Sequence, residues 1–596
     1  MKKYACILAA GKGSRLKEIT KNRSKWMVEV NENSLMNRYL KAFKKNNIED
    51  IFIITGHASE SLRNDIYNIN KELNLNIAFI HNEIYETTNN IFSLNIALKE
   101  IQKVKDLDRL ILAECDIFFT DDALNEFLSL NSGNHILGSP YEYWMDGSCI
   151  SLNSKGQIQN LLNKNEVSKS NNKKLYKTVN WYSFSCDYVI NQLAPFVSTY
   201  SANISSISYY ELVIKILLQI SHIKLSISII HPSKWVEIDD SYDLELAECY
   251  DNAFKGNLDA FVNRYGGFWK FPWIVDLTLL VNPYFPSAKM IDEFNQLSSN
   301  AIRHYPSSQK VLANLASKTF PVNKNEIVVA NGVCEIISNI LTKLDGEFEI
   351  LSPYFLEYKR VLDNRLISID SFDKFSLSNH IIIVNPNNPD GKTLNIDLIK
   401  KLLEGLSKNN KYLIYDESFA DFCLNNNLSL INNTSLKGIE NLIILKSLGK
   451  TYGIAGIRLG LLFNKNTNNI DKWRSYLPIW NINSLSEVFL DLLPRYKKEY
   501  QDSLKKMADN AHKFYEYLSN YQNKSFKVYR PTANFILLSF TSQDLLKKIE
   551  IGLFREFFLC KSIINRTGLP KYSMRLAVLD EESNSKVSKL IIRLLD

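Results

Sequence analysis

Short apolar runs alternate with helix-like stretches along the first part of the chain. Four runs have the composition of buried strands: Ala5–Ala10, Asp50–Gly56, Ile77–Ile80 and Leu110–Ala113. A segment long enough for a helix separates each run from the next, and this alternation predicts a parallel, doubly wound sheet. Ligands bind such sheets beyond the carboxyl ends of the strands. The side chains that follow these runs are therefore candidate site residues.

Charged and glycine residues follow two of these runs directly. Gly11-Lys-Gly-Ser-Arg-Leu16 comes after the first run, and a glycine turn between a strand and a helix aims backbone N–H groups at a phosphate. Glu114-Cys-Asp116 comes after the fourth run, and Asp239 follows the later run Trp235-Val-Glu-Ile. Either acid alone fits a helix cap or a solvated loop better. Together with the glycine turn, Asp116 and Asp239 favour a role as Mg²⁺ ligands, because a bridging metal lets carboxylates lie beside phosphates.

A second motif, Asn22-Arg-Ser-Lys25-Trp-Met-Val-Glu-Val-Asn-Glu-Asn-Ser-Leu, follows the glycine turn. The two motifs together resemble the nucleotidyltransferases that transfer an NMP from an NTP onto a phosphate. The lysine of that family that corresponds to Lys25 contacts the nucleotide phosphates and the acceptor, so the resemblance gives Lys25 a catalytic role. It also implies a set of nucleotide-binding residues: Ala9, Ala10, Gly11, Gly13, Arg15, Lys25, Asn90 and Ser93.

A narrower resemblance begins at Tyr85-Glu-Thr-Thr-Asn-Asn-Ile-Phe-Ser-Leu. This segment looks like the corresponding loop of bacterial choline-phosphate cytidylyltransferases. The likeness covers essentially all of residues 1–250 and implies CTP as the nucleotide. Those enzymes present an aromatic side chain to the cationic head of the acceptor, and Trp144 would take that place with Asp146 as its counter-charge. A core-capping role fits Trp144 about as well. On the resemblance alone, Lys177 would bind an acceptor phosphate.

The chain is long enough for more than one domain. At 596 residues it exceeds the size of one ordinary core. A polar stretch rich in small residues at 251–262 predicts a linker, with one domain at 1–250 and a second at 263–596.

A lysine between small residues dominates the second domain. In Lys446-Ser-Leu-Gly-Lys450-Thr-Tyr-Gly-Ile-Ala-Gly-Ile-Arg458, the hydroxyl of Ser447 comes three positions before Lys450 and Arg458 comes eight after it. An amine that forms a Schiff base must be approachable, and a hydroxyl with a guanidinium suits a phosphate. A glycine-rich turn with ordinary surface charges is the alternative for this segment alone.

Further motifs surround this lysine in a fixed order. Val329-Ala-Asn-Gly-Val-Cys-Glu335 has the pattern of a strand, a glycine turn and a helix start, Ser352-Pro-Tyr-Phe-Leu-Glu-Tyr358 is aromatic, and Asn385-Pro-Asn-Asn-Pro-Asp-Gly391 and Asp416 each follow an apolar run. This order resembles the fold-type I enzymes that use pyridoxal 5′-phosphate (PLP), in the class I/II aminotransferase branch near threonine-phosphate decarboxylase and histidinol-phosphate aminotransferase. The resemblance implies PLP bound covalently to Lys450, with Asp416 also catalytic, and these cofactor-binding residues: Gly332, Val333, Phe355, Asn388, Asp416, Ser447, Lys450 and Arg458.

The same resemblance implies substrate contacts near the C-terminus. Asn534 and Arg575 correspond to residues that hold a carboxylate, and Arg566 to one that holds a substrate phosphate. Phe419 departs from the aminotransferases, which usually carry tyrosine there, and this favours the decarboxylase side. The expected fold is α/β: a Rossmann-like nucleotidyltransferase domain, then a fold-type I PLP domain with a small C-terminal α+β subdomain, forming a homodimer through the PLP domain.

Composition limits the possible partners. The 71 basic and 64 acidic residues give a net charge of +7 and are well mixed, so the chain contains no basic block typical of nucleic-acid binding. Eight scattered cysteines favour reduced thiols in a cytoplasm over a disulfide framework. We find no signal peptide and no apolar stretch long enough to cross a membrane.

Three functional hypotheses follow. The first is a bifunctional enzyme whose PLP domain makes a small aminoalkyl phosphate or phosphonate, by decarboxylation of a phospho-amino acid or by transamination, and whose first domain joins CMP from CTP to it. The second is a PLP aminotransferase for an unrelated phosphorylated keto substrate, beside a nucleotidyltransferase that acts on a sugar phosphate. The third is a binding or regulatory protein with one inactive domain. The intact Lys25, Asp116, Asp416 and Lys450 argue against the third.

Overall fold

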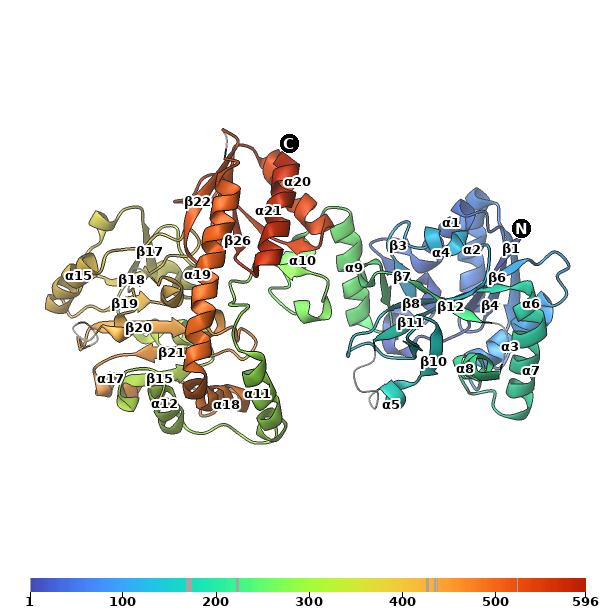
Figure 1. Cartoon of the computed structure of the whole chain (residues 1–596), viewed down its shortest axis with the longest axis horizontal. Coiled ribbons are helices and arrows are strands. Elements are labelled where there is room, and N and C mark those ends of the chain that lie inside the picture. The colour runs from blue at the N-terminus through green and yellow to red at the C-terminus, as the bar shows by residue number, and fades with distance from the viewer. Residues whose placement is uncertain are drawn as a thin grey trace. The chain divides into compact units, whose positions relative to one another are not determined.

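The computed structural model of the chain describes residues 2–167, 174–220, 224–424, 428–433, 436, 438–522 and 524–595. The chain divides into two compact units, Met1–Trp273 and Ile274–Asp596 (Figure 1). The stretch 251–262, predicted as a linker, contains the end of helix α9 (Ser241–Phe254) and all of helix α10 (Asp259–Val262). Ala253, Leu258 and Phe261 of this stretch are buried in the first unit, whereas Phe254 is 41% exposed.

The first unit is built on a nine-stranded sheet. Its main order is β10-β9-β11-β6-β1-β4-β5, and β8 pairs with β11 and β12. The parallel arrangement predicted from the apolar runs holds for β5-β4-β1-β6. The strands are β1 (Lys3–Ala9), β4 (Asp50–Thr55), β5 (Asn76–His81), β6 (Arg109–Glu114), β8 (Asn134–Pro140), β9 (Cys149–Leu152), β10 (Ile158–Leu162), β11 (Leu175–Ser185) and β12 (Leu225–Ile229).

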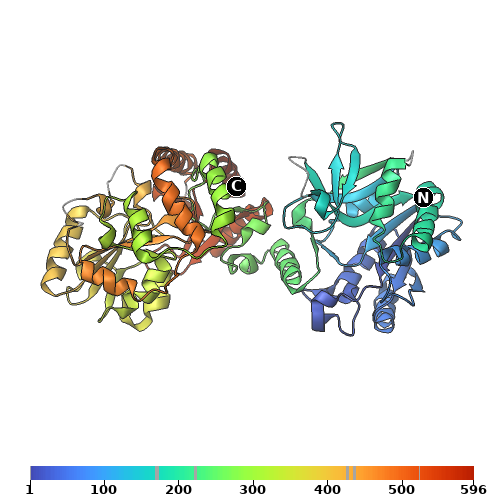
Figure 2. The same cartoon turned by 90° about the horizontal axis from the view of Figure 1, so that it is seen from below.

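Beyond β6 the sheet becomes largely antiparallel, which the sequence pattern did not predict. β11 runs antiparallel to β6, β8 and β9, and β9 runs antiparallel to β10. Antiparallel neighbours need only a short connection, such as residues 153–157 between β9 and β10, whereas parallel neighbours need a crossover. In Figure 2 the blue parallel half and the teal antiparallel half of this unit are seen apart.

Apolar layers cover both faces of this sheet. Neighbouring residues of a strand point to opposite faces, and Trp181 of β11 packs against Tyr39 and Phe43 of α1 (Leu35–Lys45). Tyr182 belongs to the core on the other face, which α3 (Asn90–Ile101), α7 (Ala194–Asn203) and α8 (Glu211–Ile220) cover. The strand ends between these layers are thereby held in place, and the site described below lies there.

The second unit contains a seven-stranded sheet in the order β15-β21-β20-β19-β18-β16-β17. Only β21 runs antiparallel to its neighbours within this described sheet. The strands are β15 (Ile327–Ala330), β16 (Phe348–Leu351), β17 (Leu366–Ile369), β18 (His380–Val384), β19 (Leu413–Asp416), β20 (Leu442–Ser447) and β21 (Gly460–Phe463). Accompanying helices include α11 (Ala288–Ala301), α12 (Gln309–Ser317), α13 (Val333–Asn339), α14 (Leu356–Leu362), α15 (Ile396–Lys408), α16 (Leu448–Thr451), α17 (Thr467–Arg474) and α18 (Ser484–Leu492).

A smaller α+β part follows, as the resemblance implied. Its sheet has the order β22-β23-β26-β25, with β22 (Phe526–Ala533), β23 (Phe535–Phe540), β25 (Lys561–Ile564) and β26 (Tyr572–Ala577). Figure 1 shows α19 (Lys497–Ser519) as a long orange helix, with α20 (Gln543–Arg555) and α21 (Glu581–Leu595) in red beside these strands. Buried residues of α19 and β23, such as Phe514 and Ile536, join the core of the larger sheet, so this part is fixed to it.

Candidate active sites

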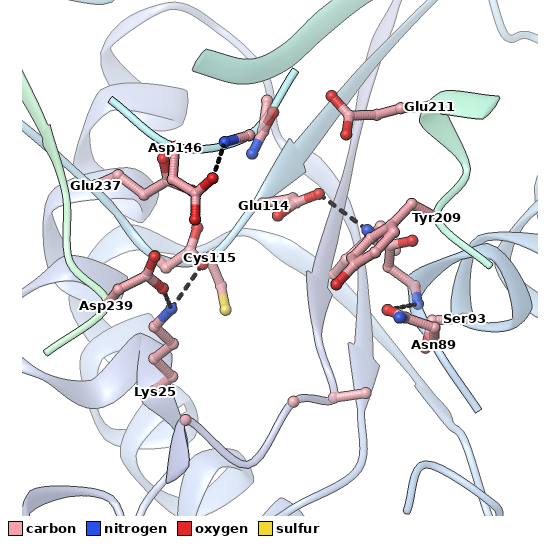
Figure 3. Close-up of a pocket in the computed structure, with 18 of the residues that line it drawn as sticks. Lys25, Asn89, Ser93, Glu114, Cys115, Asp146, Tyr209, Glu211, Glu237 and Asp239 are labelled. Carbon is pink, nitrogen blue, oxygen red and sulfur yellow. Dashed lines mark hydrogen bonds and ion pairs between the residues drawn. The ribbon is translucent and has the colours of Figure 1, made fainter. Parts of the chain in front are cut away.

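The first unit contains a cavity of about 610 Å³ at the carboxyl ends of β1 and β6 (Figure 3). The predicted residues Ala10, Gly11, Gly13, Arg15, Lys25, Asn90, Ser93, Asp116, Asp146, Lys177 and Asp239 all line it. Ala9, the last residue of β1, is buried directly before them. The structure therefore brings together residues that are more than two hundred positions apart in the sequence.

The glycine turn differs from the expected strand–turn–helix arrangement. After Gly13 the chain forms a short 3₁₀ segment, Ser14–Ile19, with a kink at Lys17, and not an α-helix. Gly13 has a positive φ of 60°, and a Cβ there would lie 3.2 Å from the Lys25 side chain. Glycine is therefore required at this position because the turn passes close to Lys25. A phosphate would meet the loop and its cations, without the dipole of a long helix.

Lys25 is the electrostatic centre of one end of the cavity. Its Nζ lies 2.8 Å from a carboxylate oxygen of Asp116 and 2.8 Å from one of Asp239, and Arg15 lies 2.8 Å from the same oxygen of Asp239 (Figure 3). Burial lowers the pKa of the Lys25 ammonium, but the two carboxylates outweigh burial and raise this pKa above its usual value. Lys25 is therefore charged, and its present partners are the two predicted metal ligands.

The two acids fit a magnesium ion that is shared with a nucleotide. Asp116 Oδ1 is buried, and no hydrogen-bond donor reaches it within the described residues. Nor does the described part of the chain arrange three or more His, Cys, Asp or Glu side chains as a metal cluster. Mg²⁺ is commonly held by one or two carboxylates together with substrate phosphates, so two acids are sufficient.

The predicted nucleotide residues Asn90 and Ser93 lie at the start of α3. Asn90 donates to Glu114 Oε1 at 3.2 Å and accepts from the backbone N–H of Tyr210 at 3.1 Å, while Ser93 accepts from Asn82 at 3.1 Å. The amide of Asn90 is thus held in one orientation between two chain segments.

Three carboxylates that the sequence analysis missed form another part of the same cavity. Glu114, Glu211 and Glu237 line it together with Lys177 (Figure 3). Lys177 is buried, and its Nζ lies 3.3 Å from Glu237. Burial raises the pKa of the Glu237 carboxyl to about 7, against the opposing effect of Lys177, and burial followed by the charge of Asp116 raises the pKa of Glu114 well above its usual value. Three carboxyl groups thus accompany one ammonium here, and burial favours the neutral form of two of them, Glu114 and Glu237.

Glu211 is held by neutral donors. It accepts hydrogen bonds from the hydroxyls of Ser148 at 3.0 Å, Thr178 at 3.2 Å and Tyr182 at 3.4 Å. Its charge is therefore fixed in position but not cancelled by these partners. The only sequence signal for Glu211 is its place at the start of an apolar helix, which is typical of any first-turn acid.

Of the predicted ammonium-binding pair, Asp146 lines the cavity and Trp144 does not. The Asp146 side chain is 66% exposed and lies 3.1 Å from the Lys164 ammonium. Trp144 packs edge-on against Trp269 with 5.7 Å between ring centroids. The aromatic contact that the structure provides for Trp144 is thus another tryptophan.

In the second unit, Lys450 lies in α16 directly after β20. Its Nζ lies 4.4 Å from the ring centre of Phe419 and 5.6 Å from that of Phe355. Burial lowers the pKa of the Lys450 ammonium. The residue therefore releases its proton more readily than an exposed lysine, which an amine that attacks an aldehyde requires.

Asp416, at the carboxyl end of β19, is buried and precisely held. Its Oδ2 accepts from the Tyr358 hydroxyl at 2.8 Å and its Oδ1 from the backbone N–H of Ser418 at 3.0 Å. Tyr358 was named in the aromatic segment but was not predicted to touch Asp416. Its position three residues after Phe355, on the first turn of α14, was the available signal.

The predicted phosphate-binding residues converge at α13. A Cβ on Gly332 would lie 2.9 Å from a guanidinium nitrogen of Arg458, and one on Gly460 would lie 2.5 Å from the Gly332 carbonyl carbon. These glycines allow Arg458 to reach the segment Gly332–Val333. Ser447 precedes α16 as its N-cap, and its N–H donates to the Ser418 hydroxyl at 3.1 Å. The closely packed turn, a guanidinium and a hydroxyl fit a phosphate.

The predicted substrate residues also meet. Arg575 donates to Asn388 Oδ1 at 2.6 Å and to the Thr278 carbonyl at 2.8 Å. Burial, and then the nearby Arg566, lower the pKa of the Arg575 guanidinium to about 10. Within the described residues, neither amide atom of the buried Asn534 has a hydrogen-bond partner. Two neighbouring guanidiniums and an unsatisfied amide fit an anionic substrate.

Two family models match the chain. The model for nucleotidyl transferase matches residues 4–136, and the model for aminotransferase class I and II matches residues 274–589. The second match spans more than half of the chain, so the chain belongs to the class I and II aminotransferase family. A nucleotidyl transferase domain precedes this domain, which confirms the predicted fusion of two enzyme domains. The class I/II domain also supports PLP as the cofactor.

Several relatives share one or both domains. CMP-5′-(3-aminopropyl)phosphonate synthase of Streptomyces rubellomurinus is 26% identical over 569 residues, which are 93% of this chain and 88% of that protein. An L-serine phosphate decarboxylase of Campylobacter jejuni is 29% identical over 53% of this chain and 87% of its own length. The solved CTP:phosphocholine cytidylyltransferase of Streptococcus pneumoniae covers 42% of this chain and 98% of its own, at 18% identity and a TM-score of 0.35.

A helix that crosses a bilayer must be both long and apolar. None of the described helices combines the length and the apolar character that a membrane crossing needs.

Proposed function

We propose that the chain is a bifunctional enzyme that makes a small aminoalkyl phosphate or phosphonate and then joins CMP to it. The main supporting observation is that both sites offer partners for the same kind of molecule. Such a molecule has an anionic group and an amine. In the first unit Lys25 and the glycine turn suit phosphates while Glu211 suits an ammonium. In the second, Arg566 and Arg575 suit the anionic groups of a phospho-amino acid.

In the first unit the proposed reaction is attack by an acceptor phosphate or phosphonate oxygen on the α-phosphorus of CTP, with release of pyrophosphate. Lys25 and Arg15 would neutralise the phosphates, and Asp116 and Asp239 would hold Mg²⁺, which would supply further positive charge. For this the Lys25 ammonium exchanges its carboxylate partners for phosphate oxygens. Asn90, fixed between Glu114 and the Tyr210 N–H, is our choice for a contact to the pyrimidine.

The acceptor amine is assigned to the carboxylates of the same cavity. A primary ammonium has three donors, and Glu211 offers a positioned carboxylate whose protein partners are uncharged hydroxyls. Asp146 is kept as a second partner, together with Trp144, and Lys177 as a contact for the acceptor's anionic end. Because Asp146 is exposed and already paired with Lys164, it contributes less than Glu211 in this proposal.

In the second unit PLP, when bound, supplies an electron sink for carbanion chemistry at the substrate's α-carbon. Lys450 would hold the cofactor, Asp416 would pair with the pyridine nitrogen, and Phe355 would lie against the ring. Asn534 and Arg575 orient the substrate carboxylate, and Arg566 binds its phosphate. Phe419 lies beside the Lys450 amine and offers no hydroxyl there. The chain's similarity to a serine phosphate decarboxylase and to an aminopropylphosphonate synthase favours decarboxylation over transamination.

The proposal includes a homodimer formed through the second unit. Tyr305 and Trp480 stack at 4.1 Å on its surface although they are 76% and 50% exposed, and Ile302 and Ile479 beside them in sequence are also exposed. Such apolar surface marks an interface. Light scattering of the purified chain tests the oligomeric state.

The eight cysteines are free thiols in the structure, in keeping with a cytoplasmic enzyme.

The decisive test combines both activities in one preparation. Purified protein with PLP, CTP and Mg²⁺ should release pyrophosphate with phosphoethanolamine, 2-aminoethylphosphonate or 3-aminopropylphosphonate, and release CO₂ from a phospho-amino acid or its phosphonate analogue. Glu211→Gln should raise the KM for the amine at least tenfold and leave the KM for CTP within about twofold. Asp146→Asn is the matched control and should change the amine KM less. A preference for a sugar phosphate that carries no amine would refute the proposal.

A further inference from the structure

The second unit contains a separate cavity of about 350 Å³ at the carboxyl ends of β16, β17 and β18. Its apolar wall is formed by Ile350, Leu351, Phe372, Ile382, Ile383, Val384 and Leu394. Among the residues that the structure describes, none assigned above to PLP or its substrate lines this cavity. Its size is at the lower end of the range of small-molecule sites.

One carboxylate oxygen in this cavity has no hydrogen-bond donor. Asp390 lines the cavity and its side chain is 4% exposed. Its Oδ1 accepts from Asn387 Nδ2 at 2.7 Å and from the Lys392 N–H at 3.3 Å, but no described residue donates a hydrogen bond to the buried Oδ2. Leaving a buried acceptor unsatisfied costs about 1–3 kcal/mol, so the site gains free energy when a donor arrives.

The charge around Oδ2 favours a cationic donor. Two carboxylates line the cavity, but Asp370 is 68% exposed and lies 2.7 Å from the ammonium of Lys374, so the buried Asp390 is the carboxylate that remains for a ligand. Lys392 Nζ lies 3.5 Å from Oδ2, too far for a good hydrogen bond, and its side chain is 74% exposed. Lys392 therefore shows that Asp390 Oδ2 attracts an ammonium group. The lysine does not itself occupy the cavity. A ligand ammonium could replace it at shorter distance, and Lys392 would return to water at little cost.

We propose that this cavity binds a short aliphatic ammonium ion as a second ligand of the PLP unit. The protonated nitrogen donates to Asp390 Oδ2, and the carbon chain lies against the apolar wall. Phosphorylated amines are disfavoured, because a phosphate would lie close to the buried carboxylate of Asp390, and Lys392, the one described cation of the lining, is 74% exposed. The ligand therefore differs in class from the zwitterions of the proposed reaction.

The loop that carries Asp390 connects the cavity with the cofactor site. Asn387, which holds Asp390 Oδ1, also donates to the Pro353 carbonyl at 2.7 Å, two residues before Phe355. Gly391 accepts a hydrogen bond from Thr532, two residues before Asn534. An ammonium at Oδ2 fixes the orientation of Asp390, and through these bonds it restrains both segments. The cavity is thus an effector site whose occupancy is felt by the cofactor and substrate residues.

Titration calorimetry of the full-length, PLP-loaded protein tests this proposal. The probe is N,N-dimethylbutylammonium, whose nitrogen donates one hydrogen bond but cannot condense with the cofactor aldehyde, and n-pentanol is the neutral control. We expect saturable binding of the amine at least tenfold tighter than that of the alcohol. Asp390→Asn should weaken amine binding at least tenfold, whereas Asp370→Asn, which removes the same charge from an exposed position, should change it less than threefold.

Two further measurements keep the test decisive. Leu394→Trp fills the apolar wall and leaves Asp390 intact, so it should also abolish binding. The visible absorption and melting temperature of each variant report whether the PLP unit is folded. Equal affinity for amine and alcohol, equal effects of the two aspartate variants, or no saturable binding at millimolar amine would each overturn the proposal.

Discussion

The two active sites of this chain treat charge in opposite ways. In the first unit, cations and carboxylates neutralise one another: Lys25 with Asp116 and Asp239, and Lys177 with Glu237. In the second, Arg566 and Arg575 lie close together with no carboxylate bond to either guanidinium among the described residues, and Asn534 has no partner.

This difference bears on how each site meets its ligands. The first must exchange partners, since phosphates and metal compete with ion pairs that already exist. In the second, neither guanidinium has a carboxylate bond among the described residues, so an anionic ligand meets Arg566 and Arg575 without first displacing an ion pair there. We therefore expect phosphate-bearing ligands to bind the second unit more tightly, and so to stabilise it more than the first at equal ligand concentration. Substitutions in the first unit should instead change metal and pH dependence.

The largest expected effect is that of Lys450→Ala. Without the amine the cofactor has no covalent attachment, so the visible absorption of lysine-bound PLP should disappear and PLP-dependent turnover should fall at least about 10³-fold. Pyrophosphate release from CTP should stay within about twofold, because the nucleotide site lies in the other unit. Lys465→Ala, an exposed lysine of the same unit, is the control. A colourless wild-type protein that takes up no PLP would contradict this assignment.

Asp116→Ala should have the next largest effect. Loss of one of the two carboxylates proposed to bind Mg²⁺ should lower pyrophosphate release by about 10²–10³-fold and raise the Mg²⁺ concentration needed for half-maximal rate. Asp121→Ala removes an 80% exposed acid five positions later and should have little effect. The visible PLP spectrum should be unchanged in both variants. If both activities fell together in a folded Asp116 variant, the separation into two sites would be wrong.

The pH dependence of stability in Glu237→Gln tests the ion pair between Lys177 and Glu237 in the first unit. The pKa of Glu237 in the folded chain is about 7, above its usual 4.5, so its contribution to stability is present below pH 4.5 and is lost as the pH rises through 7. Glutamine removes this loss. The unfolding free energy of the variant relative to wild type should therefore increase by about 1–3 kcal/mol between pH 4.5 and 8. Urea unfolding at several pH values measures this, with the exposed Glu245→Gln as control.

Several candidate site residues could be proposed from the sequence because they follow a strand or a glycine turn. Asp416 at the end of β19 and Asp116 after β6 are examples. Other candidates came from the resemblance alone: Lys177, Asn534, Arg566 and Arg575. The antiparallel half of the first sheet and the short 3₁₀ segment after Gly13 could not be predicted, since both depend on pairing and packing with distant segments.

Residues that act through tertiary partners were the ones that the sequence left out. Glu211 looks like any first-turn acid until β11 places Thr178 and Tyr182 beside it. In the sequence, Glu237 belongs to the apolar run before Asp239, and that pattern predicts no separate role for it. Conversely, Trp144 had the expected residue type, but its aromatic neighbour Trp269 comes from a segment beyond the predicted linker.

The smallest and most specific effect should be that of Tyr358→Phe. This change keeps the ring and removes only the 2.8 Å hydrogen bond to Asp416 Oδ2, which leaves the Ser418 N–H as the remaining described donor to that carboxylate. A hydrogen bond to a charged group contributes about 1.5–3 kcal/mol, so kcat/KM for the PLP reaction should fall about ten- to a hundredfold, less than for Asp416→Asn. Because Asp416 is proposed to pair with the pyridine nitrogen, the pH dependence of the PLP absorption should also shift, which a merely structural role would not produce. Tyr412→Phe is the control. Tyr412 lies directly before β19, at the end opposite Asp416, and loss of its hydroxyl should leave both readouts unchanged. An unaltered absorption profile in Tyr358→Phe would mean that Ser418 alone suffices to position Asp416.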